Sequence, residues 1–301
     1  MIIHKTYKFK LKPTKAQVSL FWQYAGACRW VYNHCLTERI ETYQATGKSP
    51  SAYDQMKRLT LLKKQAETAW LKAMPAQVLQ QAILDLDAAY ENFFAMRARY
   101  PKFKNRRSRP AFRYPQSVKV NDNRIYLPKV GWVKFFKSQD IEGKIKHATI
   151  FHRASGWYVA ISTEVELALK EPVAPTATNS IGIDLGLSHF AVLSDGRRVH
   201  NPRYYQEAQK KLAKAQRVLA RRQQGSRRWQ MQKQKVAKLC EKVANARQDF
   251  LHKLSHQLLI EYEVIITENL DLEALARGFL AKNAQDAGWG EFLRQLNYKS
   301  V

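Results

Sequence analysis

Two carboxylates in apolar segments are the residues of this sequence whose types and placement most suggest chemistry. Asp184 interrupts the run "IGIDLGLSHFAVL" (181–193), and Glu268 follows the apolar core of "YEVIITENL" (262–270). An ionised carboxylate is costly to bury unless a cation meets it. If the two strands are neighbours, the carboxylates converge at one edge of a sheet, where a hard divalent cation would neutralise them.

A carboxylate pair of this kind suits phosphodiester hydrolysis. Two divalent ions about 3.5–4 Å apart hold both the attacking water and the leaving oxygen. Gly186 follows Asp184 by two residues and would allow close approach of a nucleic-acid backbone. Simpler interpretations exist, because a strand Asp can be a buried hydrogen-bond acceptor and a Glu at a strand end is usually solvated. The combination, in a basic protein, favours the metal site.

The elements around these carboxylates alternate between strands and helices. We expect strands at 180–186 and 189–196 with an Asp-Gly turn, then two helices separated at 224–226, and a further strand at 262–270. This order is compatible with an α/β ribonuclease-H-like fold. The Pro/Ala/Thr-rich segment "LKEPVAPTATNS" (169–180) is typical of a domain boundary.

The first half of the chain combines strands with a block of helices. "KTYKFKLK" (5–12) alternates apolar and basic residues, which predicts a strand with a basic outer face. Thr14 and Gln17 form a capping box for a helix. The helical pattern continues to about residue 97, with a break at "GKSPS" (47–51), and strand-like alternation returns at 118–166 with a hairpin at 154–156. A small β-barrel with inserted helices would account for this order.

The charge of the chain predicts a polyanionic partner. Its 301 residues include 51 Lys and Arg against 25 Asp and Glu, a formal net charge of +26. Membrane-surface and ribosomal roles remain open on charge alone, but nucleic acid is favoured.

Two basic segments are the candidate contacts to nucleic acid. Residues 97–113, "RARYPKFKNRRSRPAFR", have no acidic residue and interleave aromatic rings with cations, which suits phosphates and stacked bases. A solvated basic linker has the same composition. The predicted contact residues are Lys102, Lys104, Arg106, Arg107, Arg109 and Arg113 in this segment, and Arg221, Arg222, Arg227 and Arg228 around the turn at 224–226.

Cysteine content and hydropathy exclude several classes of protein. Cys28, Cys35 and Cys240 form no Cys-x-x-Cys pair, which argues against a disulfide framework and a self-contained zinc site. The N-terminus "MIIHKTYKFKLKP" is not a signal peptide, and no apolar run approaches the roughly 18 residues that a membrane span needs. We therefore expect a cytoplasmic protein without zinc and without a membrane partner.

One competing enzyme class shares part of the motif. "IGIDLG" is also similar to the first phosphate-binding strand of the actin, Hsp70 and sugar-kinase ATPases. Those proteins need a second Gly-rich phosphate loop and an adenosine-binding segment, and neither is found in this sequence. The ATPase interpretation is therefore the minor alternative.

Taken together, the motifs resemble the TnpB family, transposon-encoded RNA-guided DNA nucleases related to type V CRISPR effectors. The resemblance runs nearly end to end and includes "YKFKLKPTKAQ", "CRWVYNHCL", "LQQAILDLDAAYENFF", "PKFKNRR", "IGIDLGLSHFAVLSDG", "RQDFLHKLSHQL" and "DAGWGEFLRQLNYK". It implies a multidomain α+β protein: a wedge-like β-barrel (1–12 plus 105–170), an inserted helical recognition lobe (13–104) and a RuvC ribonuclease-H-like nuclease domain (180–301).

The resemblance also implies cofactors, partners and site residues. Asp184 and Glu268 match the first two RuvC carboxylates, which hold Mg²⁺. A guide RNA from the transposon end and double-stranded target DNA are the implied partners, bound by a monomeric protein. Tyr53, Gln77 and Gln80 fall where the family reads a short motif beside the target, although polar residues of this kind are also ordinary on a helix surface.

The sequence departs from the family pattern near its end. The family continues into a zinc ribbon and a last catalytic Asp, whereas no Asp follows Asp286 here. Two of three carboxylates should hold a second metal poorly, so we expect weak cleavage or none. Two functions remain open: an impaired RNA-guided DNA endonuclease, or an RNA-guided DNA-binding protein without nuclease activity that acts like a repressor.

Overall fold

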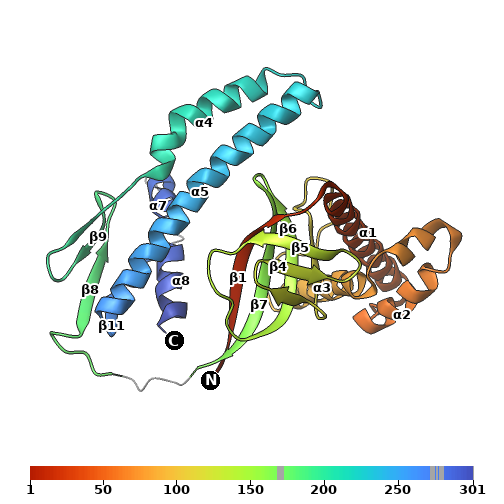
Figure 1. Cartoon of the computed structure of the whole chain (residues 1–301), viewed down its shortest axis with the longest axis horizontal. Coiled ribbons are helices and arrows are strands. Elements are labelled where there is room, and N and C mark those ends of the chain that lie inside the picture. Colours follow the sequence, from red (N-terminus) through yellow and green to blue (C-terminus); the bar gives the residue numbers. More distant parts are fainter. Residues whose placement is uncertain (168–172, 272–274, 276, 278–280, 301) are drawn as a thin grey trace. The chain divides into compact units, whose positions relative to one another are not determined.

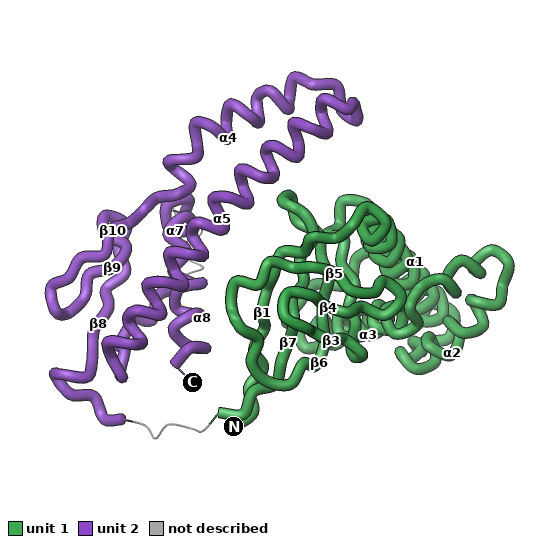
Figure 2. The backbone as a smooth tube through the Cα atoms, in the orientation of Figure 1, with its two compact units in different colours: residues 1–167 green, residues 168–301 purple. Residues whose placement is uncertain are grey.

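The computed structural model describes residues 1–167, 173–271, 275, 277 and 281–300. The chain divides into two units, residues 1–167 and 168–301 (Figure 2). The predicted boundary segment at 169–180 begins among residues outside the described ones. No helix in the described ranges is both long and apolar enough to cross a bilayer.

Unit 1 contains a seven-stranded sheet that begins with the predicted N-terminal strand. In β1 (Ile2–Lys12), Tyr7, Phe9 and Leu11 are buried and the lysines between them are exposed, as the period of two predicts. The strand order is β2-β6-β7-β1-β5-β4-β3, so its pairings describe an open sheet with two edges. The other strands are β2 (Ala111–Tyr114), β3 (Lys119–Asn121), β4 (Arg124–Leu127), β5 (Gly131–Phe136), β6 (Lys144–Arg153) and β7 (Gly156–Glu166).

Capping residues set the ends of the first helices. The predicted capping box forms at Thr14 and Gln17 and starts α1 (Lys15–Thr46), which ends at Gly47 in the left-handed conformation that glycine favours. A second capping box, from Ser51 to Asp54, starts α2 (Ala52–Leu62). A 3₁₀ helix, η1 (Ala66–Ala73), and α3 (Ala76–Phe94) complete the helical block.

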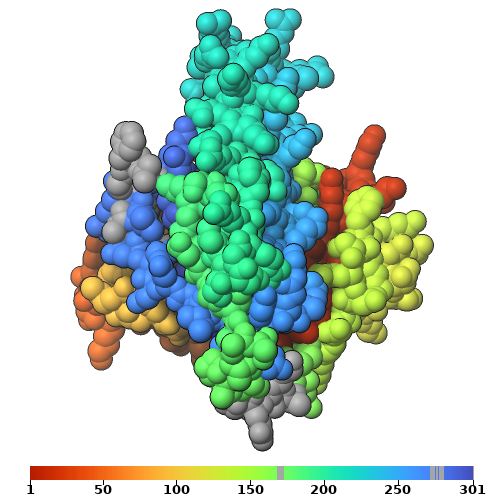
Figure 3. Space-filling model, turned by 90° about the vertical axis from the view of Figure 1, so that its left-hand side faces the viewer, coloured from red at the N-terminus to blue at the C-terminus, as the bar shows by residue number. Residues whose placement is uncertain are grey.

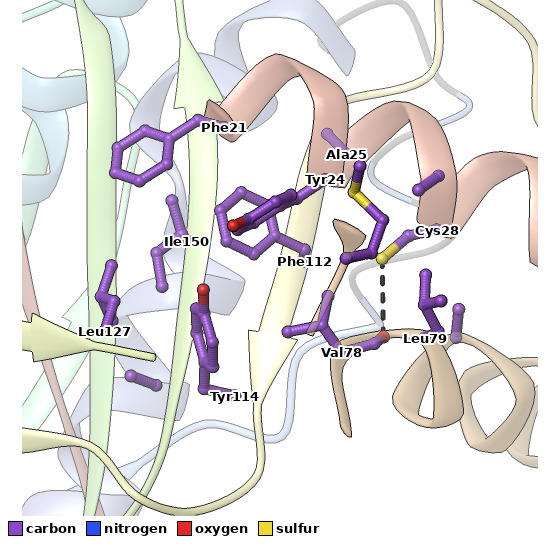
Figure 4. Packing of buried hydrophobic residues seen from close by; sticks show 14 of the residues in the cluster. Phe21, Tyr24, Ala25, Cys28, Val78, Leu79, Phe112, Tyr114, Leu127 and Ile150 are labelled. Atoms are coloured by element: carbon purple, nitrogen blue, oxygen red, sulfur yellow. Dashed lines mark hydrogen bonds between the residues drawn. The ribbon is translucent and has the colours of Figure 1, made fainter. Parts of the chain in front are cut away.

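The helices and the sheet of unit 1 share one hydrophobic core. Phe21 on α1 packs against Phe112 on β2 and Trp157 on β7, with ring centroids 5.6 and 5.1 Å apart. Figure 4 shows Phe21, Tyr24 and Phe112 between the helix and the strands. The expected helical lobe is therefore packed onto the sheet, because the apolar faces of α1 and α3 are buried against β2.

The described part of unit 2 contains a four-stranded sheet in the order β10-β9-β8-β11. β8 pairs with β9 antiparallel and with β11 parallel. These strands are β8 (Ser180–Leu185), β9 (His189–Leu193), β10 (Arg198–His200) and β11 (Val264–Thr267). The predicted Asp-Gly turn joins β9 to β10, with Gly196 at φ 86°.

Helices cover one face of this sheet and also extend beyond it (Figure 1). Leu251 and Leu258 on α5 (Arg227–Glu261) and Phe292 on α8 (Trp289–Lys299) join the strand residues in a single core. The first half of α5 instead pairs with α4 (Tyr204–Ala220), where Gln232 donates a hydrogen bond to the carbonyl oxygen of Ala215. This α4–α5 hairpin forms the projection at the top of Figure 3. A short helix, α7 (Ala281–Ala287), precedes α8.

Candidate metal centre and nucleic-acid interface

The parallel register of β8 and β11 runs toward Asp184 on β8 and toward Glu268, the residue that follows β11. The register of β8 and β11 runs from Ser180 beside Val264 to Ile183 beside Thr267. Continued by one residue, it puts Glu268 next to Asp184. Paired strands lie about 4.8 Å apart. Extended in this way, the register would bring the two carboxylates, 84 positions apart in the sequence, to the same end of the sheet.

Asp184 is exposed, and the expectation of a carboxylate inside a buried strand is wrong. Ile181, Ile183 and Leu185 are buried on the helix-covered face, and alternation turns Asp184 to the opposite face. Glu268 is also exposed. The carboxylates therefore avoid the cost of burial and remain accessible to a ligand that approaches the open face of the sheet.

The donors at this edge match the needs of a magnesium ion that is bound together with a substrate. Within the described residues, neither Asp184 nor Glu268 has an ion pair or hydrogen bond, so their oxygens are available. The described part of the chain contains no group of three or more His, Cys, Asp or Glu side chains that could hold a metal ion by itself. Magnesium is commonly bound through one or two carboxylates plus substrate phosphates. The pair fits that mode of binding.

Gly186 has a structural explanation that the sequence did not reveal. A Cβ atom there would lie 3.2 Å from the carbonyl oxygen of His189, closer than most side chains tolerate. The Gly186 N–H also donates to the carbonyl oxygen of Phe190 at 3.3 Å. The tight connection between β8 and β9 therefore leaves little space for a side chain at this position.

Arg198 is a cation on the carboxylate side of the sheet that sequence reasoning missed. Arg198 pairs with Val192, and Val192 pairs with Asp184. These three residues form a row across β10, β9 and β8, and paired residues project to the same face. The Asp195-Gly196 turn fixes the β9–β10 register, so the hairpin rules could have located Arg198.

The basic segment of unit 1 divides into exposed and packed residues. Lys102, Arg106, Arg107 and Arg109 are exposed, as expected for contacts to phosphate. Lys104 is half-buried, with its Nζ 3.7 Å from the ring centroid of Tyr32, and burial lowers the pKa of its ammonium group.

Arg113, the last residue of this segment, also packs against the protein. It is half-buried, and its Nη1 lies 3.9 Å from a carboxylate oxygen of Asp85. Among the predicted contacts of this segment, the exposed cations are therefore Lys102, Arg106, Arg107 and Arg109.

The four arginines of the second basic segment lie at the α4–α5 turn, with Arg221, Arg227 and Arg228 exposed. Arg222 is half-buried and donates a hydrogen bond to the carbonyl oxygen of Arg228 at 2.7 Å, which closes the turn. Three cations therefore face solvent at the end of the hairpin.

The three residues selected for reading a DNA motif lie on α2 and α3, which contact each other. Tyr53 on α2 is 66% exposed, with the Lys57 ammonium 4.5 Å from its ring centroid. On α3, Gln80 is exposed and Gln77 is half-buried. Tyr53 and Gln80 are therefore accessible to a ligand, and Gln77 is partly so.

Two family models match this chain. A model described as a probable transposase matches residues 159–278, and one described as a helix-turn-helix domain matches residues 1–48. In the structure, residues 1–48 form β1 and the single long helix α1.

Two relatives that match nearly all of this chain show its family. InsQ of Escherichia coli (strain K12), provisionally named an RNA-guided DNA endonuclease, is 37% identical, over 99% of this chain and 78% of InsQ. A protein of Streptomyces pristinaespiralis with the same provisional activity in its name is 31% identical, over 99% of this chain and 75% of that protein. The chain belongs to the TnpB family, as its motifs predicted.

Solved structures are similar to this chain as well. The Cas12f1–sgRNA–target DNA complex aligns with 99% of this chain and 82% of the Cas12f1 chain, at 13% identity and a TM-score of 0.31. That score is too low to transfer a fold.

Proposed function

We propose that this chain binds a guide RNA and, together with it, a matched double-stranded DNA target. The names of its relatives and its family membership support this function. A net charge of +26 supports it independently, because a polyanion would neutralise an excess of this size. The exposed cations of both basic segments supply contacts to phosphate. We expect one protein copy in each ribonucleoprotein, in the cytoplasm.

The nuclease site of this proposal consists of Asp184 and Glu268. Its main support is the parallel register of β8 and β11, which, continued by one residue, would set Glu268 beside Asp184. A divalent cation held between these carboxylates and a target phosphate would supply Lewis-acid activation for phosphodiester hydrolysis. The chain's own residues orient the phosphate at this edge, and Arg198 adds positive charge on the same face.

The domain assignments follow from the same arrangement. We assign residues 180–301 to a RuvC ribonuclease-H-like domain, supported by three antiparallel strands followed by a strand parallel to the first. We assign the sheet of unit 1 to the expected wedge-like barrel, residues 1–12 plus 105–170, of which 168–170 lie outside the described residues. The strand pairings of the described residues leave this sheet open between β2 and β3. The recognition lobe, 13–104, reads the motif beside the target through Tyr53, Gln77 and Gln80.

The proposal keeps target binding separate from cleavage. Cleavage depends on divalent ions held at the carboxylates, and two-metal hydrolysis places two such ions side by side. Target binding depends on the basic segments, so it should persist when cleavage is slow. A DNA-binding, repressor-like protein is therefore the second candidate function.

Purified ribonucleoprotein and a plasmid that matches its co-purified RNA provide the test. Binding of the plasmid should weaken steeply as the salt concentration rises. Binding that does not depend on salt would contradict the proposed nucleic-acid contacts. Any magnesium-dependent cleavage should disappear in Asp184→Ala while binding persists. Cleavage that survives Asp184→Ala would remove the nuclease assignment, and binding without cleavage in the unsubstituted chain would favour the second candidate.

A further inference from the structure

The outer surface of α1 contains an aromatic groove that neither proposed site includes. Its volume is about 860 Å³, within the range of small-molecule sites. Its walls include the rings of Trp22, Trp30, Trp70 and Phe103, with Arg29 and His34 beside them. Trp22, Trp70 and Phe103 are 46%, 44% and 53% exposed, so large flat surfaces face solvent.

The groove is built from a regular spacing on one helix. Trp22, Gly26, Trp30 and His34 follow one another at intervals of four residues, which places them along one face of α1. A Cβ atom on Gly26 would meet nothing within 4 Å, so the floor between the rings is open. The Trp30 and His34 rings are stacked, with centroids 4.9 Å apart and an interplanar angle of 7°.

A second element fixes the far wall. Trp70 comes from η1 and meets Trp30 edge to face, with centroids 5.8 Å apart and an interplanar angle of 77°. This contact holds Trp30 in place while leaving Trp70 open to solvent. Pre-positioned, partly exposed rings of this kind are suited to stacking with a planar ligand.

The charge at the groove favours an anionic ligand. The residues that line it include Arg29 and His34 and no Asp or Glu. Phe103 belongs to the basic segment 97–113, where its neighbours Lys102, Arg106 and Arg107 are exposed and no carboxylate occurs. An apolar peptide would satisfy the rings but gain nothing from these cations. A strand with flat bases and a phosphate backbone satisfies both.

We propose that this groove binds unpaired bases of single-stranded RNA, stacked on Trp22, Trp30, Trp70 and Phe103, with the phosphates held by Arg29 and the neighbouring basic segment. The inference rests on the proposed function, because a ribonucleoprotein supplies such RNA. It adds a stacking site to that function. Stacking of bases on aromatic side chains combined with a basic track is the general mode of single-strand recognition.

Photocrosslinking locates the bases directly. The probe is an oligouridylate that contains 5-iodouracil, bound to the full-length chain and irradiated. Crosslinked peptides should contain Trp22, Trp30, Trp70 or Phe103. Crosslinks confined to other peptides, or an oligouridylate that leaves the intrinsic tryptophan fluorescence unchanged, would overturn the inference. Unchanged tryptophan fluorescence is also the result expected if the groove binds an apolar peptide instead of RNA.

A matched pair of tryptophans provides the control for affinity. Trp70→Ala should weaken oligouridylate binding about tenfold, the loss expected for one stacked base. Trp70→Phe should restore most of it. Trp132 on β5 is exposed to the same extent, 44%, but lies outside the groove, so Trp132→Ala should leave affinity within about twofold.

An abasic oligomer separates stacking from phosphate contact. The unsubstituted chain and Trp70→Ala should bind it equally, because the bases that distinguish them are absent. Equal loss with Trp70→Ala and Trp132→Ala would overturn the groove while leaving salt-dependent binding, and hence the proposed function, intact. Failure of the unsubstituted chain to bind any oligouridylate, even at low salt, would overturn both.

Discussion

Arg247 on α5 donates a hydrogen bond from Nη2 to a carboxylate oxygen of Asp286 on α7, at 2.7 Å. The Asp286 side chain is only 5% exposed and also accepts from the backbone N–H of Tyr205 at the start of α4. One carboxylate therefore joins three helices. Asp286 is the last aspartate of the sequence. Its contacts show a structural role, because they hold the three helices together.

Removal of the Asp286 carboxylate should destabilise unit 2. Asp286→Ala leaves Arg247 and the Tyr205 N–H without their acceptor, so we expect a loss of about 3 kcal/mol in the free energy of unfolding. Urea denaturation provides the measurement. The exposed Asp249–Lys253 pair on α5 is the control, and Asp249→Ala should cost less than about 0.5 kcal/mol. Similar losses in both variants would contradict the structural role.

Arg39 should be essential for the helical block of unit 1. Its side chain is 5% exposed, and it donates to Asp87 on α3 at 2.7 Å and to Gln55 on α2 at 2.9 Å. Arg39→Ala leaves the buried Gln55 and the half-buried Asp87 without their donor, and we expect a loss of about 3 kcal/mol in the free energy of unfolding.

The control for Arg39 is an arginine that makes a similar pair at the surface. Arg58 is 51% exposed and pairs with Glu38. Arg58→Ala should cost less than about 1 kcal/mol by the same denaturation measurement. An Arg39→Ala protein as stable as Arg58→Ala would show that the buried pairing is not needed.

The three cysteines should differ sharply in reactivity. Cys240 is exposed, whereas Cys28 and Cys35 are buried, and burial raises the pKa of each buried thiol from 9.0 to about 12. An electrophilic reagent that reacts with cysteine thiolates should, at pH 8, modify one cysteine in the folded protein and all three in denaturant. Rapid modification of Cys28 without denaturant would contradict this packing.

The same pKa shifts predict instability at alkaline pH. Below pH 9 both buried thiols are protonated whether the chain is folded or unfolded, so their contribution to stability is complete. Between pH 9 and about 12 the unfolded state loses these protons first, and the free energy of unfolding should fall. Cys28→Ala plus Cys35→Ala should flatten this dependence, and an unchanged pH profile would contradict it.

Charge removal in the basic segment should separate binding from stability. Arg106→Ala plus Arg107→Ala removes two exposed cations, so the salt dependence of nucleic-acid binding should fall by about one unit of slope per lost phosphate contact. Lys104→Ala should instead mainly reduce stability, because its ammonium packs on Tyr32. Gel-shift titrations at several salt concentrations, paired with thermal unfolding, measure both. Equal salt slopes for the double arginine variant and for Lys104→Ala would contradict this distinction between phosphate contact and packing.

Local signals in the sequence were sufficient for many elements. The alternation of Tyr7, Phe9 and Leu11 predicted β1, and Thr14 with Gln17 predicted the start of α1. Two apolar strands predicted that Asp184 and Glu268 lie close together, and the parallel pairing of β8 with β11 supports that prediction. Each of these features depends on residues that are close in sequence or on strands with a clear pattern.

The rest depends on tertiary packing, which no local pattern determines. Alternation did reveal two faces in β8, but only the packing of α5 and α8 decided which face is covered. Lys104 belongs to the basic segment by sequence, but only the fold brings its Nζ to 3.7 Å from the ring centroid of Tyr32. The four-residue spacing from Trp22 to His34 was visible in the sequence, but Trp70 and Phe103 join that face only in the folded protein.

The binding of manganese, a spectroscopic substitute for magnesium, tests most directly whether Asp184 and Glu268 share one cation. Its affinity is measured by electron paramagnetic resonance, with a DNA oligonucleotide present to supply phosphate, for Asp184→Asn, Glu268→Gln and the double variant. Asp249→Asn serves as the control. A shared ion predicts that each single variant loses at least about tenfold in affinity and that the double variant loses little more. Single variants that bind as the unsubstituted chain does, or losses that simply add in the double variant, would contradict the shared site.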